Sequence, residues 1–361
     1  MRPPPAQSEM ISEREAISLR TLLLGDSSRT QMPAAWKHQG LTFSKDVPFG
    51  LLQHDGGPCG VIAVAQAHLV DELLEDKWRS PSPETRARAL VRALTRVLWR
   101  CCASGIATFC APTPTPRVDR SPRYAPDGTT ECLRLWRADS PQILAEIVEY
   151  HLHAWMDPRG PGILCFLYSA LLSRTVARAR ADMDQDKPLV DGHGYAAQEA
   201  VNLLTIGRAH SNVFDGTKTL EDNIHGSNDV VELRGIPNRS DLGLLTLHEA
   251  YGYYRVGDNL KTPRRPVWIV YSESHYSVLF FGDDPRLVDD RRLPEVFDLI
   301  YWDGLGGQDE LIRLTIDVEG FHVAGRDPPD PNQALIPPLD LVIRTKWPHA
   351  SVDWHDTEPI L

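Results

Sequence analysis

The spacing of apolar residues follows a helical period through the first part of the chain and a strand period towards its end. Four helices are predicted, over 83–100, 140–155, 162–177 and 194–207. Ser82 and Pro83 mark the start of the first, because serine caps helix N-termini and proline is favoured at the first helical position. From Val267 onward, runs of apolar and aromatic residues predict strands. We therefore expect an α+β fold.

The first 30 residues are expected to form an N-terminal segment of their own, helical and partly flexible. A single apolar-patterned stretch precedes a polar Gly-Asp-Ser-Ser connection, and its apolar members are Ile17, Leu19, Leu22, Leu23 and Leu24. The folded core is predicted to begin near Trp36, and residues 31–361 are predicted to form one domain, which a chain of this length can fill. Residues 111–131, with their Pro, Asp and Gly, read as a long loop.

Two charged patterns call for an interpretation. The helix over 83–100 carries a row of arginines, which we interpret as a solvated face; binding of an acidic partner is the alternative. The arginines are Arg86, Arg88, Arg92, Arg96 and Arg100. Asp182, Asp184 and Asp186 match the first ligands of a calcium loop, but Lys187 replaces the required glycine and His193 the required glutamate. We expect an acidic loop there and no metal site.

The composition of the chain excludes several classes of function. Lys and Arg total 38 against 49 Asp and Glu, and this net charge of −11 argues against a broad nucleic-acid surface. The longest apolar stretch, Gly162 to Leu172, is too short to cross a bilayer, and the opening residues lack the apolar core of a signal peptide. We expect a protein of the cytoplasm, with the nucleus as a second location, and no membrane contact. Its six cysteines should then be free thiols, and without a CxxC pair no zinc or other cofactor is implied.

One of these cysteines stands in a setting that favours reactivity. Cys59 follows a Gly-Gly-Pro turn and opens an apolar segment, so its thiol is predicted on the first turn of a buried helix. Unpaired amides and peptide dipoles there stabilise a thiolate, and glycines such as Gly57 let a substrate backbone approach. Gln53, six residues upstream, could aim its amide at a substrate carbonyl oxygen. The plainer interpretations, a core cysteine and a turn glutamine, stay open at this point.

A histidine and an acid complete the candidate chemistry. Two apolar runs flank Ser-Glu-Ser, which places His275 at the mouth of a predicted hairpin. Asp303 ends a further predicted strand, from which it could orient the imidazole. Cysteine on a helix, histidine on one strand and a carboxylate on the next is the papain arrangement.

Five ordered blocks of the sequence resemble the MINDY family of deubiquitinases, and more narrowly its minor branch with larger catalytic domains. They are GLLQHDGGPCGVIAVAQA at 50–67, QEAVNLLTIGRAHSNVFDG at 198–216, VGDNLKTPRRPVWIVYSESHYSVLF at 256–280, YWDGLGGQDELIRLTI at 301–316 and TKWPHASVDW at 345–354. The resemblance spans roughly Leu19 to Leu361. It implies a papain-like cysteine protease fold with helical insertions, the nucleophile at a helix N-terminus and the histidine on a central antiparallel strand.

The resemblance also implies an activity and site residues. The family's nucleophile falls on Cys59, its oxyanion glutamine on Gln53 and its base on His275, while Asp303 is our choice for the third group. The implied reaction is hydrolysis of isopeptide bonds in polyubiquitin, with a preference for chains linked through lysine 48 of ubiquitin. A ubiquitin-binding protein without catalysis and a thiol acyltransferase are the alternatives.

Ubiquitin and its chains would be the partners, and the basic ubiquitin tail with its two terminal glycines would need a narrow channel. Trp268, Tyr276 and Trp302 could wall that channel, and Glu273 or Asp309 could meet a tail arginine. Each of these has an alternative structural interpretation, because strand aromatics usually pack into cores.

Overall fold

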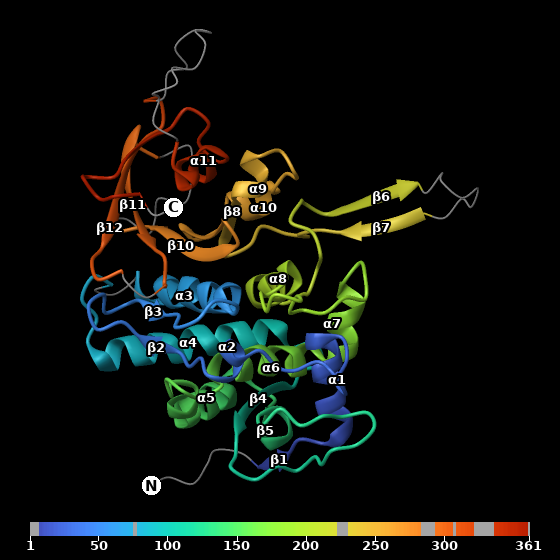
Figure 1. Ribbon diagram of the computed structural model, residues 1–361. Coiled ribbons are helices and arrows are strands. Elements are labelled where there is room, and N and C mark those ends of the chain that lie inside the picture. The colour runs from blue at the N-terminus through green and yellow to red at the C-terminus, as the bar shows by residue number, and fades with distance from the viewer. Residues whose placement is uncertain are drawn as a thin grey trace.

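The computed structural model of the protein describes residues 7–74, 78–221, 230–282, 293–305, 308–320 and 336–359. These residues form a mixed α and β structure in which helices are stacked between two sheets (Figure 1). The larger sheet, formed mainly by the C-terminal part of the chain, lies at one end of the stack, and the smaller sheet lies at the other.

The larger sheet has six strands in the order β13-β12-β11-β10-β9-β8. Their bounds are Gly243–Thr246 (β8), Val267–Ser272 (β9), His275–Phe281 (β10), Val296–Trp302 (β11), Ile312–Asp317 (β12) and Ser351–Asp353 (β13). β8 runs parallel to β9, and every other neighbouring pair is antiparallel. The predicted change to strands at Val267 is confirmed, and β10 lies inside the sheet between β9 and β11.

Helices cover both faces of this sheet. Successive side chains of a strand point to opposite faces, so the apolar residues of these strands belong alternately to two separate clusters. On one face Val278 and Phe280 of β10 join the main core beneath α3 (Cys59–Leu73). On the other face Leu279 and Phe281 join a second cluster beneath α11 (Pro338–Arg344).

Helices α3, α4 (Pro83–Cys101) and α6 (Gly162–Arg174) pack in succession away from the large sheet, and α6 rests on the small sheet. The small sheet has the order β1-β5-β4. Its strands and the other elements of this half are β1 (Ser8–Met10), β4 (Ala107–Pro112), η1 (Thr130–Cys132), β5 (Leu133–Ala138), α5 (Pro141–Trp155), α7 (Val176–Asp182) and α8 (Gln198–Ile206). The helices predicted at 83–100 and 140–155 are confirmed, with Ser82 and Ser140 as their N-caps.

The other two predicted helices differ in extent. The segment 162–177 breaks at Thr175, whose φ of 66° ends α6 and whose hydroxyl caps α7. The helix expected from residue 194 begins at Gln198, because Ala196 first forms a bridge with Val190. Among the described helices, none alone is long and apolar enough to cross a membrane; α6 and α7 pass that test only together, bent by 86° at their break.

The N-terminal segment packs into the same core as the rest of the chain. A capping box between Ser12 and Glu15 starts α1 (Glu13–Leu24), and its buried Leu19, Leu22 and Leu23 lie in the main cluster. β1 adds a strand beside β5. The prediction that the core begins near Trp36 is therefore wrong, and residue 30 does not separate two packing units. Short apolar helices bury their stripe wherever the tertiary fold offers a surface, which sequence does not reveal.

The remaining elements are short. They are α2 (Ala34–Lys37), β2 (Thr42–Phe43), β3 (Leu51–Leu52), β6 (Thr217–Glu221), β7 (Val230–Arg234), α9 (Leu247–Ala250) and α10 (Asp258–Lys261). β2 pairs with β3, and β6 with β7 in a hairpin that extends away from the stack (Figure 1).

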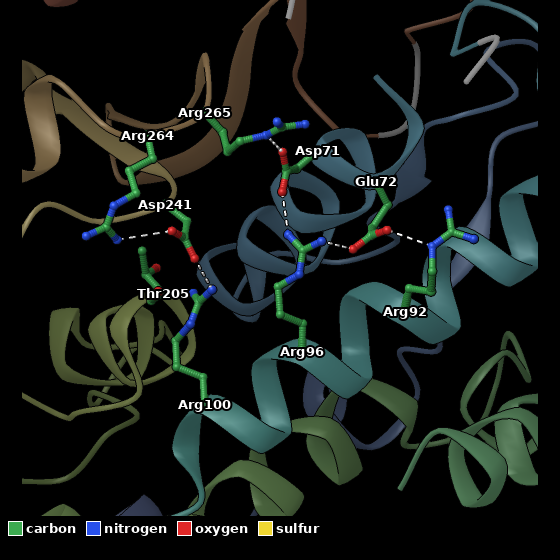
Figure 2. A network of polar contacts seen from close by, with 9 residues as sticks. All are labelled: Asp71, Glu72, Arg92, Arg96, Arg100, Thr205, Asp241, Arg264 and Arg265. Carbon is green, nitrogen blue, oxygen red and sulfur yellow. Dashed lines mark hydrogen bonds and ion pairs between the residues drawn. The ribbon is translucent and has the colours of Figure 1, made fainter. Parts of the chain in front are cut away.

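The arginines of α4 pair with acidic residues of neighbouring elements (Figure 2). Arg96 contacts the buried Asp71 of α3 at 2.5 Å and also binds Glu72, and Arg100 contacts Asp241 at 2.5 Å. Arg92 binds Glu72 as well, at 2.7 Å. The interpretation of this row as a solvated face is thus wrong at these three positions, although their partners are internal rather than a second molecule. The acids lie 20 or more residues away in sequence, so the helix pattern alone could not reveal them.

Candidate active site

Cys59 is the first residue of α3, as predicted, and is only 2 % exposed. No side chain among the described residues caps the helix at Pro58, so the first-turn amides of α3 are not claimed by a cap. Gly57 makes the approach to Cys59 possible with a φ of +131°, and a Cβ atom there would lie 2.8 Å from the Gly194 carbonyl oxygen. The turn therefore requires glycine for its backbone conformation and for its close packing.

His275 is presented by a two-residue hairpin between β9 and β10. Ser272 pairs with His275, and the two residues between them, Glu273 and Ser274, both have positive φ (48° and 66°). Two consecutive positive φ values are typical of a type I′ turn, whose twist matches that of the strands. Glycine or asparagine is usual there, so this turn holds two residues in an unfavourable region. It places the imidazole at the end of the sheet, with the side chain 19 % exposed.

The imidazole joins the thiol to an acid. Its Nε2 lies 2.9 Å from the Asp303 carbonyl oxygen and 3.3 Å from Asp303 Oδ1. The Cys59 thiol lies close enough to the ring to contribute to the raised pKa of His275, and its Sγ is directed at the Gly57 carbonyl oxygen, 3.9 Å away. Because Nε2 faces Asp303, Nδ1 is the nitrogen left for the thiol. Burial lowers the pKa of His275, but the hydrogen bonds with Asp303 and Cys59 and the Asp303 charge outweigh it and raise that pKa to about 10.

Asp303 is fixed by its own partners. Oδ1 accepts from the Leu305 amide at 3.0 Å, and Oδ2 accepts from the Tyr301 hydroxyl at 3.2 Å. The Asp303 amide donates to Gln308 Oε1 at 2.9 Å. Burial raises the pKa of Asp303, but the hydrogen bond and charge of His275 and the other donors leave it below its usual value. Sequence reasoning missed Tyr301 and Gln308, although Tyr301 stands two residues before the acid, on the same face of the strand.

Gln53 lies beside the same strand end. Its backbone amide donates to the Gly304 carbonyl at 2.7 Å, which makes a short bridge to the segment that follows Asp303. Its side chain is buried, and Nε2 donates to the Asp55 carbonyl at 2.8 Å. One of the two Nε2 hydrogens is therefore engaged within the loop, and the other is the donor that a substrate oxygen could use.

Two aromatic residues predicted to wall a substrate channel are core residues, so those predictions are wrong. Trp268 is 3 % exposed and packs in the second cluster against Trp347. Trp302 is 1 % exposed; it packs on Phe49, and its Nε1 donates to the Leu51 carbonyl at 3.1 Å. Helices cover both faces of the large sheet, so the two tryptophans are buried although they belong to different clusters. Trp302 still matters to the site, since it holds the strand that leads to Gln53.

Two other predicted substrate residues, Tyr276 and Glu273, lie at or next to an open cleft, whereas Asp309 is exposed and is not among the residues that line it. Tyr276 and Ser274 line a cleft of about 780 Å³, together with Tyr271 and Tyr195. Tyr276 stacks on Tyr271 at 4.3 Å between ring centroids. Glu273 is exposed on the hairpin turn next to this cleft. The cleft therefore begins beside His275 and carries an aromatic wall.

Metal ligation is not supported where the structure describes the chain, since no group of three His, Cys, Asp or Glu side chains gathers there. In the predicted acidic loop, Asp182 pairs with Arg174 and Asp186 with Arg180.

A thiol at a helix start, an imidazole near it and a carboxylate behind the imidazole make up the site of cysteine enzymes that attack carbonyl carbons.

Comparison with known proteins defines the family more narrowly. The conserved-domain model described as "Deubiquitinating enzyme MINDY-3/4" matches residues 20–356. The chain belongs to this family, which confirms the resemblance found in the sequence.

Individual relatives agree with this family. "Probable ubiquitin carboxyl-terminal hydrolase MINDY-4" of Mus musculus is 38% identical over 377 residues, covering 99% of this chain and 49% of that protein. Its Homo sapiens counterpart is 38% identical over 98% of this chain and 47% of its own length. "Ubiquitin carboxyl-terminal hydrolase MINDY-3" of Homo sapiens is 32% identical over 69% of this chain and 60% of that protein. The chain spans about half the length of the MINDY-4 relatives. No solved structure matches it.

Proposed function

We propose that this chain is a deubiquitinating cysteine protease that hydrolyses isopeptide bonds in polyubiquitin, using a papain-like arrangement of Cys59, His275 and Asp303. The observation that carries the proposal is the placement of the Cys59 thiol at the start of α3, near an imidazole that contacts both the Asp303 carboxylate and the Asp303 carbonyl. Family membership supports ubiquitin as the substrate, because the relatives are named as ubiquitin hydrolases.

In this mechanism His275 takes the thiol proton, and the thiolate attacks the carbonyl carbon of ubiquitin's terminal glycine. The tetrahedral oxyanion receives hydrogen bonds from the Cys59 amide and from the free Nε2 hydrogen of Gln53. His275 then protonates the departing lysine amine, and water hydrolyses the thioester with the same imidazole as base. Asp303 holds the ring so that Nδ1 faces the sulfur.

The cleft beside His275 suits the approach of an extended tail. Its aromatic wall, Tyr276 and Tyr271, would flank a glycine-rich backbone, and the exposed Glu273 would face a tail arginine. Gly57 removes side-chain bulk immediately before the nucleophile. The preference for lysine-48 linkage rests on the resemblance to the family, and the site geometry carries no argument about linkage.

The deciding experiment is covalent labelling with a ubiquitin-vinyl electrophile, followed by digestion of diubiquitins of every linkage. Wild-type chain should form one adduct at Cys59 and cut lysine-48 diubiquitin fastest. Cys59→Ala should abolish both, whereas Cys102→Ala, at the one cysteine that is not buried, should change neither. Adduct formation at another cysteine contradicts the assignment. Binding without cleavage, or neither, would indicate a ubiquitin-binding protein or an acyltransferase.

A further inference from the structure

An arginine-lined pocket of about 340 Å³ lies away from the catalytic residues, where the ends of α4 and α8 meet the loop before β8. Part of it appears in Figure 2, where Arg100, Asp241 and Arg264 face one another. The residues used in the argument are Arg100, Arg208, Arg239, Ser240, Asp241 and Arg264. A water molecule occupies about 30 Å³, so a pocket of this volume has more room than one inorganic phosphate needs. Its volume falls in the range of small-ligand sites.

Positive charge in the pocket is left largely uncompensated. Among the described residues that line the pocket, Asp241 is the lone acid, and it is shared between Arg100 at 2.5 Å and Arg264 at 3.3 Å. Arg239 donates to two main-chain carbonyls, those of Thr262 and Pro263, which carry no formal charge. Arg208 makes no hydrogen bond or ion pair with the part of the chain that the structure describes, and its side chain is exposed. Four guanidinium groups against one carboxylate leave a net charge of +3 in a protein of net charge −11.

A buried hydroxyl and a partly buried guanidinium in the lining would also gain from an anion. The Ser240 hydroxyl is buried and finds no hydrogen-bond partner among the described residues. A buried polar group of this kind is costly unless a ligand or water satisfies it. Burial lowers the pKa of Arg100 despite the Asp241 charge beside it, so a further anion would stabilise that guanidinium.

We propose that this pocket binds a phosphate monoester. A phosphoryl group carries up to two negative charges and three acceptor oxygens, which match several guanidinium forks better than one carboxylate does. The Ser240 hydroxyl would donate to one oxygen, and Arg208 and Arg239 would close on the others. Room beyond the phosphate would take the organic part of the ester.

The pocket lies at the opposite end of α3 from the nucleophile. Arg264 precedes Arg265, which binds Asp71, and Asp71 lies about 18 Å along the helix from Cys59 at 1.5 Å per residue. Substitutions in the pocket therefore leave the catalytic residues untouched, and this proposal does not depend on the proposed protease activity.

The test is isothermal titration and thermal unfolding of the full chain with inorganic phosphate, at ionic strength held constant with chloride. A phosphoserine peptide and adenosine monophosphate form two further arms, which distinguish a phosphorylated side chain from a small metabolite. All three probes should bind and raise the melting temperature in the wild type. Arg208→Glu should weaken binding at least about tenfold, and Ser240→Ala about fivefold, while diubiquitin cleavage stays at the wild-type rate.

The matched control is Arg88→Glu. Arg88 is an exposed arginine of α4, about 18 Å along the helix from Arg100. It makes the same charge change outside the pocket and should leave phosphate binding intact. Stronger binding of one ester than of inorganic phosphate identifies the source, and equal binding still supports a site for the phosphoryl group. The proposal is overturned if none of the probes binds the wild type, or if Arg88→Glu weakens binding as much as Arg208→Glu.

Discussion

Replacing Asp303 by asparagine separates two tasks that the site gives to one residue. The carboxylate supplies negative charge 3.3 Å from Nε2 of His275, while the Asp303 main-chain carbonyl, at 2.9 Å, accepts the Nε2 proton. An asparagine at this position keeps the main-chain carbonyl. Its side-chain oxygen also takes the place of Oδ1, because the Leu305 amide that donates to Oδ1 selects oxygen over nitrogen there. The variant should therefore retain the imidazole tautomer and lose only the charge.

The magnitude follows from the distance. Two unit charges 3.3 Å apart attract by about 5 kcal/mol at an effective dielectric constant of about 20. The imidazole is partly open to solvent, and the charge acts on the protonated ring before and during the reaction, so only about a quarter to a half of this energy should appear in the rate. We expect cleavage of diubiquitin to fall about 10- to 100-fold, well short of the ~10⁴-fold loss seen when an asparagine fixes the wrong tautomer.

Two measurements from pH 5 to 10 test this prediction. Initial rates of diubiquitin cleavage give the loss of activity, and the rate of Cys59 alkylation by iodoacetamide reports the pKa of His275. Loss of the carboxylate removes the main partner that raises the pKa of His275, so that pKa falls from about 10 towards its ordinary value and the alkylation profile changes at alkaline pH. Asp298→Asn, on the same strand but paired with Arg313, is the control and should leave both measurements unchanged. A loss beyond about 10³-fold for Asp303→Asn would show that the carboxylate, and not the carbonyl, sets the tautomer.

Three further predictions concern other groups. Gln53→Ala should lower turnover about 100-fold with little change in substrate affinity. Alkylation of Cys59 by iodoacetamide forms no carbonyl oxyanion and should keep its wild-type rate. Slower alkylation would instead indicate that the substitution distorts the loop. Because the pKa of His275 is raised in the folded protein, its protonation stabilises the fold fully below pH 6.5, and this contribution disappears as the pH rises through about 10. The free energy of unfolding that His275→Gln loses, measured by urea titration, should therefore become smaller between these two pH values. A difference that stays constant with pH would refute the raised pKa. Asp71→Ala removes the buried acid that Arg96 and Arg265 share. Because both arginines reach solvent and Arg96 keeps Glu72, the free energy of unfolding should fall by about 1–3 kcal/mol, whereas a loss under ~0.5 kcal/mol would place this network with ordinary surface pairs.

Local signals in the sequence predicted much of the site and of the helices around it. The start of α3 at Cys59, the hairpin before His275 and the strand end at Asp303 each follow from residues within a few positions. What the sequence could not supply is contact between distant segments. The pairing of Arg96 with Asp71 spans 25 residues, and nothing local distinguishes a paired arginine from a solvated one.

Burial of aromatic residues was hidden for a related reason. Trp268 and Trp302 stand on strands that bear site residues, and their sequence neighbours are the same whether a helix or solvent covers their face of the sheet. Only the stacking of α3 on one face and α11 on the other decides the matter, and that depends on the order of all six strands.

The two-residue turn at Glu273 and Ser274 constrains which insertions and deletions this family of chains can accept. Surface loops usually tolerate changes in length, but here the next residue after the turn is the imidazole itself. One added residue would either bulge or shift β10 by a single position, and a shift of one carries every side chain to the opposite face of the sheet. His275 would then point away from the thiol, so length variation in this part of the chain has to be accommodated elsewhere.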